Sequence, residues 1–293
     1  MKMVQFIANS LVLASLYALA SIGFVIIYRS SRILNLAHGE LIMLGGYFGF
    51  VIIPLLGGIT WAGVILAFLC SFVLGLLLYF LFIRPLMGEP LFAPIMLTIG
   101  LSIMLKGIAG FIWGADPRML TLSLKIPDAP HQIFTDLILS TYDIAIIFAA
   151  IFFLGGILLF LKYSRLGIQM RAAAESHLLA SQRGINILAI LALTWSIAVI
   201  TATATGILYG ASVNISPETG LVGIKALSVA IVGGMGSIVG IIPAALIVAF
   251  AEYGVSRYIG PELSEIIPMA IMLLVLLIRP WGLLGTKEEV ERL

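Results

Sequence analysis

The sequence has little charge and almost no cysteine. Only 10% of its 293 residues are Asp, Glu, Lys or Arg, whereas 61% are hydrophobic, and the mean hydropathy is +1.18. A soluble domain carries about 25% charged residues, so this composition argues against a soluble fold. The single cysteine, Cys70, lies inside an apolar run. An intrachain disulfide therefore cannot form, and we expect a buried, inert thiol.

Motifs that would support catalysis are also missing. The G-x4-G-K-[ST] pattern of nucleotide-binding loops does not occur, so the chain has no visible means of hydrolysing ATP. The Ser, Thr and Cys residues show no nucleophile–base arrangement, and the histidines and acids do not form a metal-ligand set. The net charge of +2 gives no sign of nucleic-acid binding. We expect a chain that is not an enzyme, with no catalytic residue, metal or cofactor of its own and no nucleic-acid partner.

Long apolar runs dominate the sequence. Runs of about 20 residues predict membrane-spanning helices, and these runs do not alternate in polarity as the strands of a membrane barrel would. They cover residues 5–28, 34–53, 61–83, 91–113, 140–161, 187–212, 222–236, 238–256 and 264–279. Only the uncharged stretch 233–237 divides 222–236 from 238–256, so this pair is either two short crossings or a helix pair that dips into the membrane. The sequence predicts an all-α, polytopic membrane protein with eight or nine membrane helices, including short or re-entrant glycine-rich segments, in one transmembrane domain over residues 1–293.

Lysine and arginine are unevenly distributed, and in membrane proteins they collect on the cytoplasmic side. If the N-terminus lies outside and successive segments cross the membrane in alternate directions, the loops on the inner side hold ten of these residues. They are Arg29, Arg32, Arg84, Lys162, Arg165, Arg171, Arg183, Arg279, Lys287 and Arg292. The outer intervals hold five: Lys2, Arg118, Lys125, Lys225 and Arg257. The bias predicts an outer N-terminus and a cytoplasmic C-terminus, provided that 222–256 enters and returns to the same side. The interval at about 114–139 then faces outward, and its prolines and acids predict an ordered loop with a short helix or strand at most.

The interval 162–186 is the longest mixed, basic and alanine-rich stretch of the chain. Its charged residues are Lys162, Arg165, Arg171 and Arg183, against the single acid Glu175. The charge distribution places this interval in the cytoplasm, with apolar segments on both sides. We therefore hypothesise that the membrane protein meets a soluble partner here.

A few polar side chains lie where a bilayer would make them costly. Asn35, His38 and Glu40 fall within six residues, and in a helix Asn35 and His38 would share a face. We favour a structural role for them, capping and anchoring the cytoplasmic start of the second helix, over a proton relay or a metal site. Lys106 is expected to snorkel toward the outer interface, and Glu252 is expected near an interface.

Glycine and threonine form two further patterns. Gly45–Gly49, Gly206–Gly210 and Gly236–Gly240 have the G-x-x-x-G spacing. Close packing within the chain is the plainer interpretation, and a subunit interface is the alternative. Five hydroxyl residues between 194 and 205 would bond back to their own helix carbonyls, or would line a polar pathway.

Three separated stretches carry recognisable motifs. In order they are Asn35-Leu36-Ala37-His38-Gly39-Glu40 with Met43-Leu44-Gly45-Gly46-Tyr47, then Arg171-Ala172-Ala173-Ala174 through Ala180 to Gly184-Ile185-Asn186, then Gly233-Gly234-Met235-Gly236-Ser237-Ile238-Val239-Gly240. They resemble the early signature, the cytoplasmic coupling loop and the late glycine-rich signature of the permease subunits of branched-chain amino acid ABC importers. The resemblance covers essentially the whole chain, whose short form looks more like the first of the two paired permeases. One departure is that the Glu-Ala-Ala start of the general coupling loop reads Arg171-Ala172-Ala173 here, with Glu175 displaced.

The resemblance implies a division of labour among subunits. The chain would pair with a homologous second permease and dock two cytoplasmic ATPase subunits, which use ATP and Mg²⁺. An extracytoplasmic substrate-binding protein would deliver leucine, isoleucine or valine, and the chain would lie among lipids of a bacterial or archaeal plasma (inner) membrane. Within the coupling loop, at about 162–186, the ATPase contacts would be Arg171, Ala172, Glu175, Ala180, Gly184, Ile185 and Asn186. The structural or gating positions would be Asn35, His38, Gly39, Glu40, Gly233, Gly234, Gly236, Ser237 and Gly240.

The mechanism expected from this resemblance is alternating access driven by a partner's ATP. Other members of the family carry urea, short amides or other amino acids and share the same signatures, so this substrate range is an alternative. An ion-coupled secondary transporter is a second alternative. Such a transporter would need carboxylates embedded in the membrane to bind the coupling ion. Only Glu40 and Glu252 are candidates for that role. An intramembrane enzyme or a scaffold is a further alternative, and no catalytic constellation supports the enzyme.

Overall fold

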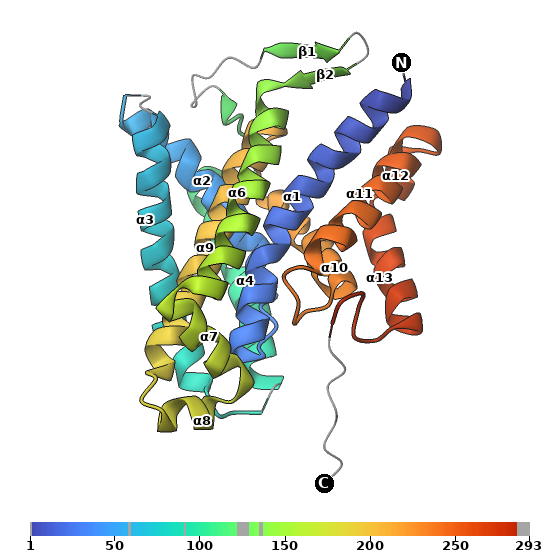
Figure 1. Ribbon diagram of the computed structural model, residues 1–293. Coiled ribbons are helices and arrows are strands. Elements are labelled where there is room, and N and C mark those ends of the chain that lie inside the picture. Colours follow the sequence, from blue (N-terminus) through green and yellow to red (C-terminus); the bar gives the residue numbers. More distant parts are fainter. Residues whose placement is uncertain (1, 58–59, 91, 122–128, 135–136, 286–293) are drawn as a thin grey trace.

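The chain folds into a bundle of long helices with a small hairpin at one end (Figure 1). The computed structural model describes residues 2–57, 60–90, 92–121, 129–134 and 137–285. Within these ranges, eight helical segments are long and apolar enough to cross a membrane. They are α1 (Lys2–Ser31), α2 (His38–Leu55), α3 (Thr60–Leu78) continued by η1 (Tyr79–Ile83) and η2 (Arg84–Leu86), α4 (Phe92–Trp113), α6 (Thr141–Tyr163), α9 (Ile187–Ser212), α11 (Ile241–Tyr258), and α12 (Pro261–Ser264) with α13 (Ile267–Ile278). The predicted polytopic helical fold is confirmed.

The hairpin lies in the interval between α4 and α6. Strand β1 (Pro130–Phe134) pairs antiparallel with β2 (Leu137–Ser140), which agrees with the prediction of a short helix or strand at most. Residues 122–128 and 135–136 of this loop lie outside the described residues. A capping box then starts α6, because the Ser140 hydroxyl accepts a hydrogen bond from the Asp143 N–H and the Asp143 carboxylate accepts one from the Ser140 N–H.

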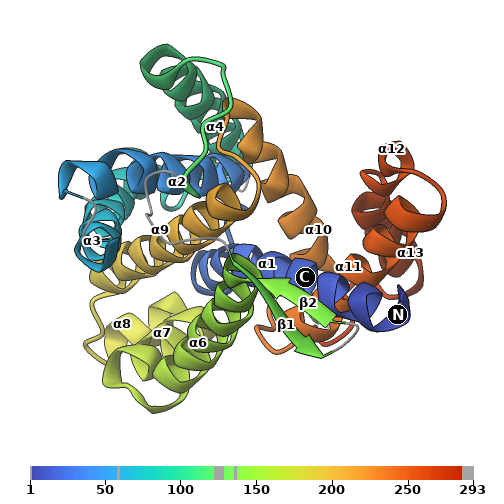
Figure 2. The ribbon, with the colours of Figure 1, turned by 90° about the horizontal axis from the view of Figure 1, so that it is seen from above.

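Three helices form the centre of the bundle, and the others surround them (Figure 2). The apolar windows of α1, α2 and α9 are 78%, 67% and 67% buried, against 28% or less for α3, α4, α6 and the α12–α13 segment. The outer helices are apolar all round, as lipid-facing helices are. Cys70 lies on α3 and is exposed in the isolated chain, so the expectation of a buried thiol was wrong.

Glycines let the three central helices approach closely. A Cβ atom at Gly206 of α9 would overlap the carbonyl oxygen of Ile42 on α2, and one at Gly45 would overlap the backbone of Thr203. Gly49 and Gly210 likewise face neighbouring side chains of the same chain. Intrachain packing is thus the role of Gly45–Gly49 and Gly206–Gly210. The pair Gly236–Gly240 does not lie on a helix face, because both residues belong to the turn before α11.

The two predicted apolar segments 222–236 and 238–256 form one short helix, α10, and one long helix, α11. Helix α10 (Val222–Gly233) has 12 residues, about 18 Å of helix, which is too short to cross a bilayer. The turn η3 (Pro217–Leu221) precedes it and leads the chain from the end of α9 back into the bundle, where Gly220 contacts Gly39. The predicted short, glycine-rich segment is therefore present beside the eight long ones.

The two ends of the bundle carry different elements (Figure 1). The start of α1 lies at the hairpin end, where the Gln5 side-chain amide donates to the Ile138 carbonyl. The two short helices α7 (Arg165–Glu175) and α8 (His177–Gln182) lie at the opposite end. Helix α11 returns to the hairpin end, since Tyr258 packs on Phe6 of α1. The pair α10–α11 therefore enters and returns to the same side, as the charge-based orientation requires.

Candidate functional site

The early motif (Asn35–Glu40 with Met43–Tyr47) lies inside the bundle. Helix α1 ends at Ser31, and Arg32, with φ of 57°, reverses the chain so that the next residues run back along α1. His38 then packs on Phe24, with ring centroids 4.5 Å apart. A Cβ at Gly23 would overlap the imidazole ring. Eight residues of α1 separate Gly23 from its end, so His38 lies deep in the bundle and not at an interface.

The expected cap at the start of α2 is not formed as predicted. The helix begins at His38, the N-cap residue is Ala37, and no side chain caps it. Asn35 precedes the helix, so it does not share a helical face with His38. Its side-chain oxygen instead accepts a hydrogen bond from the Ala37 N–H at 3.1 Å. Neither ring nitrogen of His38 has a partner at hydrogen-bonding geometry among the described residues, although the Ala20 carbonyl is close enough to interact.

One glycine and one acid of the early motif hold the re-entrant segment, which comprises η3 and α10. A Cβ on Gly39 would overlap the carbonyl of Gly220, and one on Gly223 would overlap Gly39. The Glu40 carboxylate lies against Gly220, at 3.0 Å from the position of an added Cβ. Only residues without side chains allow α2 and the η3–α10 junction to touch in this way. The early motif is therefore the surface on which the re-entrant segment rests.

The late glycine motif (Gly233–Gly240) makes the turn between α10 and α11. Gly234 has φ of 98°, which favours glycine, and a Cβ at Gly233 would meet the Gly240 carbonyl. The Ser237 hydroxyl accepts a hydrogen bond from the Gly240 N–H at 3.1 Å, whereas Gly236 faces open space. The chain after α13 packs on this turn, because the Leu284 N–H donates to the Gly233 carbonyl at 3.1 Å.

Two ion pairs flank the re-entrant segment. Lys225 of α10 lies 2.7 Å from the Glu252 carboxylate of α11, and the Tyr17 hydroxyl of α1 donates to the same carboxylate at 2.6 Å. Glu252 is buried among these helices. The pair ties three helices together within the membrane, where a lone carboxylate would be strongly destabilising.

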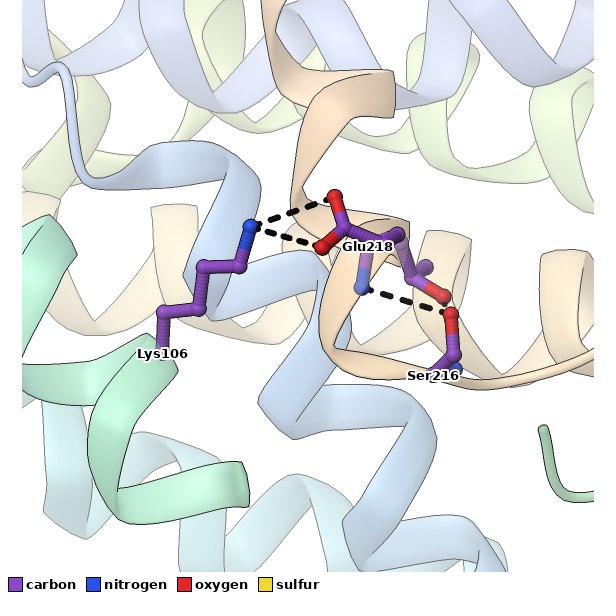
Figure 3. A network of polar contacts seen from close by, with 4 residues as sticks. Lys106, Ser216 and Glu218 are labelled. Carbon is purple, nitrogen blue, oxygen red and sulfur yellow. Dashed lines mark hydrogen bonds and ion pairs between the residues drawn. The ribbon is translucent and has the colours of Figure 1, made fainter. Parts of the chain in front are cut away.

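The second pair joins α4 to η3 (Figure 3). The Lys106 ammonium lies 3.0 Å and 3.1 Å from the two carboxylate oxygens of Glu218, and the Ser216 hydroxyl accepts a hydrogen bond from the Glu218 N–H. Lys106, which the sequence predicts to snorkel toward the outer interface, is paired with this acid. The rule that charges in a membrane find partners predicts that each of these residues is paired. Sequence spacing gives no sign of which residues meet.

The hydroxyl streak of α9 is buried and mostly satisfied within its own helix. Thr194, Ser196, Thr201 and Thr205 each donate to a carbonyl three or four residues earlier. The hydroxyls of Thr203 and Ser71 on α3 lie 2.6 Å apart. The back-bonded interpretation is therefore confirmed, and the buried hydroxyls give no support to a pathway along α9.

The basic interval forms two short helices with polar caps. The Ser164 hydroxyl caps α7, the Ser176 hydroxyl caps α8 and the Asn186 side chain caps α9. His177 Nε2 lies 2.9 Å from the Ser30 carbonyl and fastens α8 to the end of α1. The helices change direction at Ser176, so residues 172–180 do not share one helical face.

The predicted contact residues differ in their exposure. Glu175, Gly184 and Asn186 are exposed, and Arg171, Ala172 and Ile185 are half-buried. Only 4% of the surface of Ala180 is exposed. This residue therefore packs on the inner side of α8 and cannot be presented to a partner as expected. Leu178 and Leu179, which the motifs in the sequence did not single out, are 68% and 62% exposed at the tip of α8. Two adjacent leucines in a basic loop were the signal that could have identified them.

The Lys225–Glu252 pair gives a stability prediction. Replacing Glu252 by alanine leaves a partly buried ammonium without its carboxylate, and we expect a loss of roughly 3 kcal/mol. Thermal unfolding of the purified protein in detergent should show a Tm several degrees lower. The double variant Lys225→Met, Glu252→Met should recover most of the loss, and Glu262→Ala, on exposed α12, should change nothing. A Glu252→Ala variant as stable as wild type would contradict this account.

The arrangement defines a multi-pass helical membrane protein with a half-length, re-entrant helix held by glycines and ion pairs. Comparison with known proteins assigns the family. The family described as "Branched-chain amino acid transport system / permease component" matches residues 6–276. This chain belongs to that family.

Several relatives match over nearly their whole length. The permease protein BraD of the high-affinity branched-chain amino acid transport system of Pseudomonas aeruginosa is 32% identical, with 98% of this chain and 97% of the relative covered. LivH of Escherichia coli (strain K12), with the corresponding description, is also 32% identical, over 97% and 96% of the two chains. A probable LivH of Methanocaldococcus jannaschii is 25% identical over 97% and 94%. No solved structure matches the chain.

Proposed function

We propose that this chain is a permease subunit of an ATP-driven importer for leucine, isoleucine and valine. The observation that carries the proposal is its nearly full-length match to permease proteins of high-affinity branched-chain amino acid systems. In this proposal it forms the translocation pathway with a homologous second permease. An extracytoplasmic binding protein delivers the substrate, and two ATPase subunits, using ATP and Mg²⁺, supply the energy.

The α7–α8 segment is the proposed ATPase-docking surface. It lies at the end of the bundle opposite the hairpin (Figure 1), and it presents two exposed leucines beside arginines. Exposed leucines fit an apolar groove, and the surrounding charges set the orientation. The proposed contacts exclude the buried Ala180 and are Arg171, Ala172, Glu175, Gly184, Ile185 and Asn186. This assignment places the α7–α8 end in the cytoplasm and the N-terminus outside.

The first alternative, a family member for urea or short amides, differs only in substrate. It is tested by reconstituting the permease pair with its ATPases and binding protein and measuring ATP-dependent uptake of labelled leucine and urea. We expect leucine to accumulate and urea not to accumulate. Uptake of urea with no uptake of leucine would overturn the proposed substrate while leaving the family unchanged.

Gly184 provides a test of the docking surface. Its φ of 79° favours glycine, and nothing lies within 4 Å of an added Cβ. Gly184→Trp should project a ring from the docking surface and reduce ATP-driven uptake about tenfold, as loss of one interface hot spot does. Asparagine tolerates the same backbone conformation, so Gly184→Asn should retain uptake. Wild-type uptake and wild-type assembly with the ATPases in Gly184→Trp would show that the ATPase does not contact this position.

A further inference from the structure

The Lys106–Glu218 pair is exposed although it lies well inside the length of the bundle. Seven residues of α4, about 10 Å of helix, follow Lys106 before the helix ends at Trp113. Glu218 lies on η3, in the segment that descends from α9 to Gly39. The two side chains are 41% and 66% exposed. Lipid cannot solvate such charges, so this face must meet water or protein within the membrane.

The charges at this face do not balance. The Glu40 carboxylate lies against Gly220, two residues along the chain from Glu218. Among the described residues Glu40 has no cationic partner, and Lys225 is held by Glu252. The local set therefore contains two carboxylates, Glu40 and Glu218, and one ammonium, Lys106. Glu40 is the carboxylate left without an ammonium partner, since Lys106 pairs with Glu218.

Apolar surface adjoins these charges. Residues three apart eclipse each other in a 3₁₀ turn, so Leu221 lies on the same side of η3 as Glu218. Leu221 is 52% exposed, and Ile224, in the first turn of α10, is 45% exposed. Figure 2 shows this part of α10 between α4 and the α12–α13 segment. The face thus combines charges of both signs with exposed aliphatic side chains.

We propose that Glu40, Glu218 and Lys106 form this subunit's half of a binding site for the zwitterionic head of an α-amino acid. The ammonium of the substrate binds between the two carboxylates, and its carboxylate binds the Lys106 ammonium. The aliphatic side chain lies against Leu221 and Ile224. The site rests on the proposed function, and the second permease completes it. A substrate without an ammonium group, such as urea, would give Glu40 no cationic partner, so the charge set favours amino acids.

Uptake by the complete reconstituted complex tests the site. Glu40→Gln, Glu218→Gln and Lys106→Gln should each lower ATP-dependent leucine uptake about tenfold, since each loses a charged hydrogen-bonding group. Glu262→Gln on α12 is the matched control and should retain uptake. The exchange Lys106→Glu, Glu218→Lys preserves the pair but reverses its polarity relative to Leu221, so it should not restore uptake. Wild-type uptake in the three glutamine variants, or full recovery in the exchange, would overturn the proposal.

A second measurement leaves the ion pair intact. On a Cys70→Ala background, Leu221→Cys in the complete complex should react with a hydrophilic thiol reagent, and saturating leucine should slow the reaction. Phe152→Cys, on the outer helix α6, should show no effect of leucine. A Leu221→Cys thiol that does not react, or that leucine does not protect, would overturn the site. If the wild-type complex took up no leucine at all, the proposed function itself would fail.

Discussion

Replacing Leu178 and Leu179 together by aspartate is expected to abolish ATP-driven uptake. Both side chains project from the tip of α8, with 68% and 62% of their surface exposed. In the proposed complex they fill an apolar groove of the ATPase, and two buried carboxylates there would each cost several kcal/mol. Uptake by proteoliposomes should fall to background, and the ATPases should no longer copurify with the permease.

The permease itself should be unaffected by this change. Because the two leucines are largely exposed, the doubly substituted chain should reach the membrane and purify at the wild-type yield. Leu178→Met with Leu179→Met conserves volume and apolar character, so it should retain uptake. If the aspartate variant still bound the ATPases and transported leucine at the wild-type rate, α8 would not be the docking element.

Gly206→Leu is expected to have the second large effect, on folding. A Cβ at this position already overlaps the Ile42 carbonyl and comes close to the Gly46 N–H of α2. These neighbours are backbone atoms, so they cannot turn aside as a side chain would. Separating α2 from α9 at the centre of the bundle should cost about 3 kcal/mol or more. Size-exclusion chromatography in detergent should show little folded, monodisperse protein.

Gly155 of α6 is the matched control for this substitution. It is also a helical glycine, and nothing lies within 4 Å of a Cβ added to it. Gly155→Leu should therefore retain the wild-type yield, and a slight gain in stability is expected because leucine favours helix over glycine. Equal yields of Gly206→Leu and Gly155→Leu would show that the close approach of α2 and α9 is not required.

The helices could be predicted because a bilayer imposes a length on each apolar run. Which side of a helix faces the interior could not be predicted, since lipid-facing and buried positions are both apolar. Cys70 illustrates this, because its apolar run is the same whether the residue faces lipid or core. The contrast in burial between α1 and α3 depends on tertiary packing alone.

The polar groups show the same division between local and long-range information. The back-bonded hydroxyls of α9 were predictable because the partners lie within one helical turn. The Lys225–Glu252 and Lys106–Glu218 contacts join residues far apart in the chain, so spacing could not pair them. The depth of His38 follows from the reversal at Arg32, and a non-glycine residue with positive φ leaves no clear mark in a sequence.

The central claim is that the energy for transport enters from partner ATPases. It is tested by comparing leucine uptake into proteoliposomes that contain this chain alone with uptake into proteoliposomes that contain the complete complex. We expect uptake only with the partner subunits and ATP, and none by the chain alone under a proton or sodium gradient. Gradient-driven accumulation of leucine by the chain alone would contradict the account and identify an ion-coupled transporter.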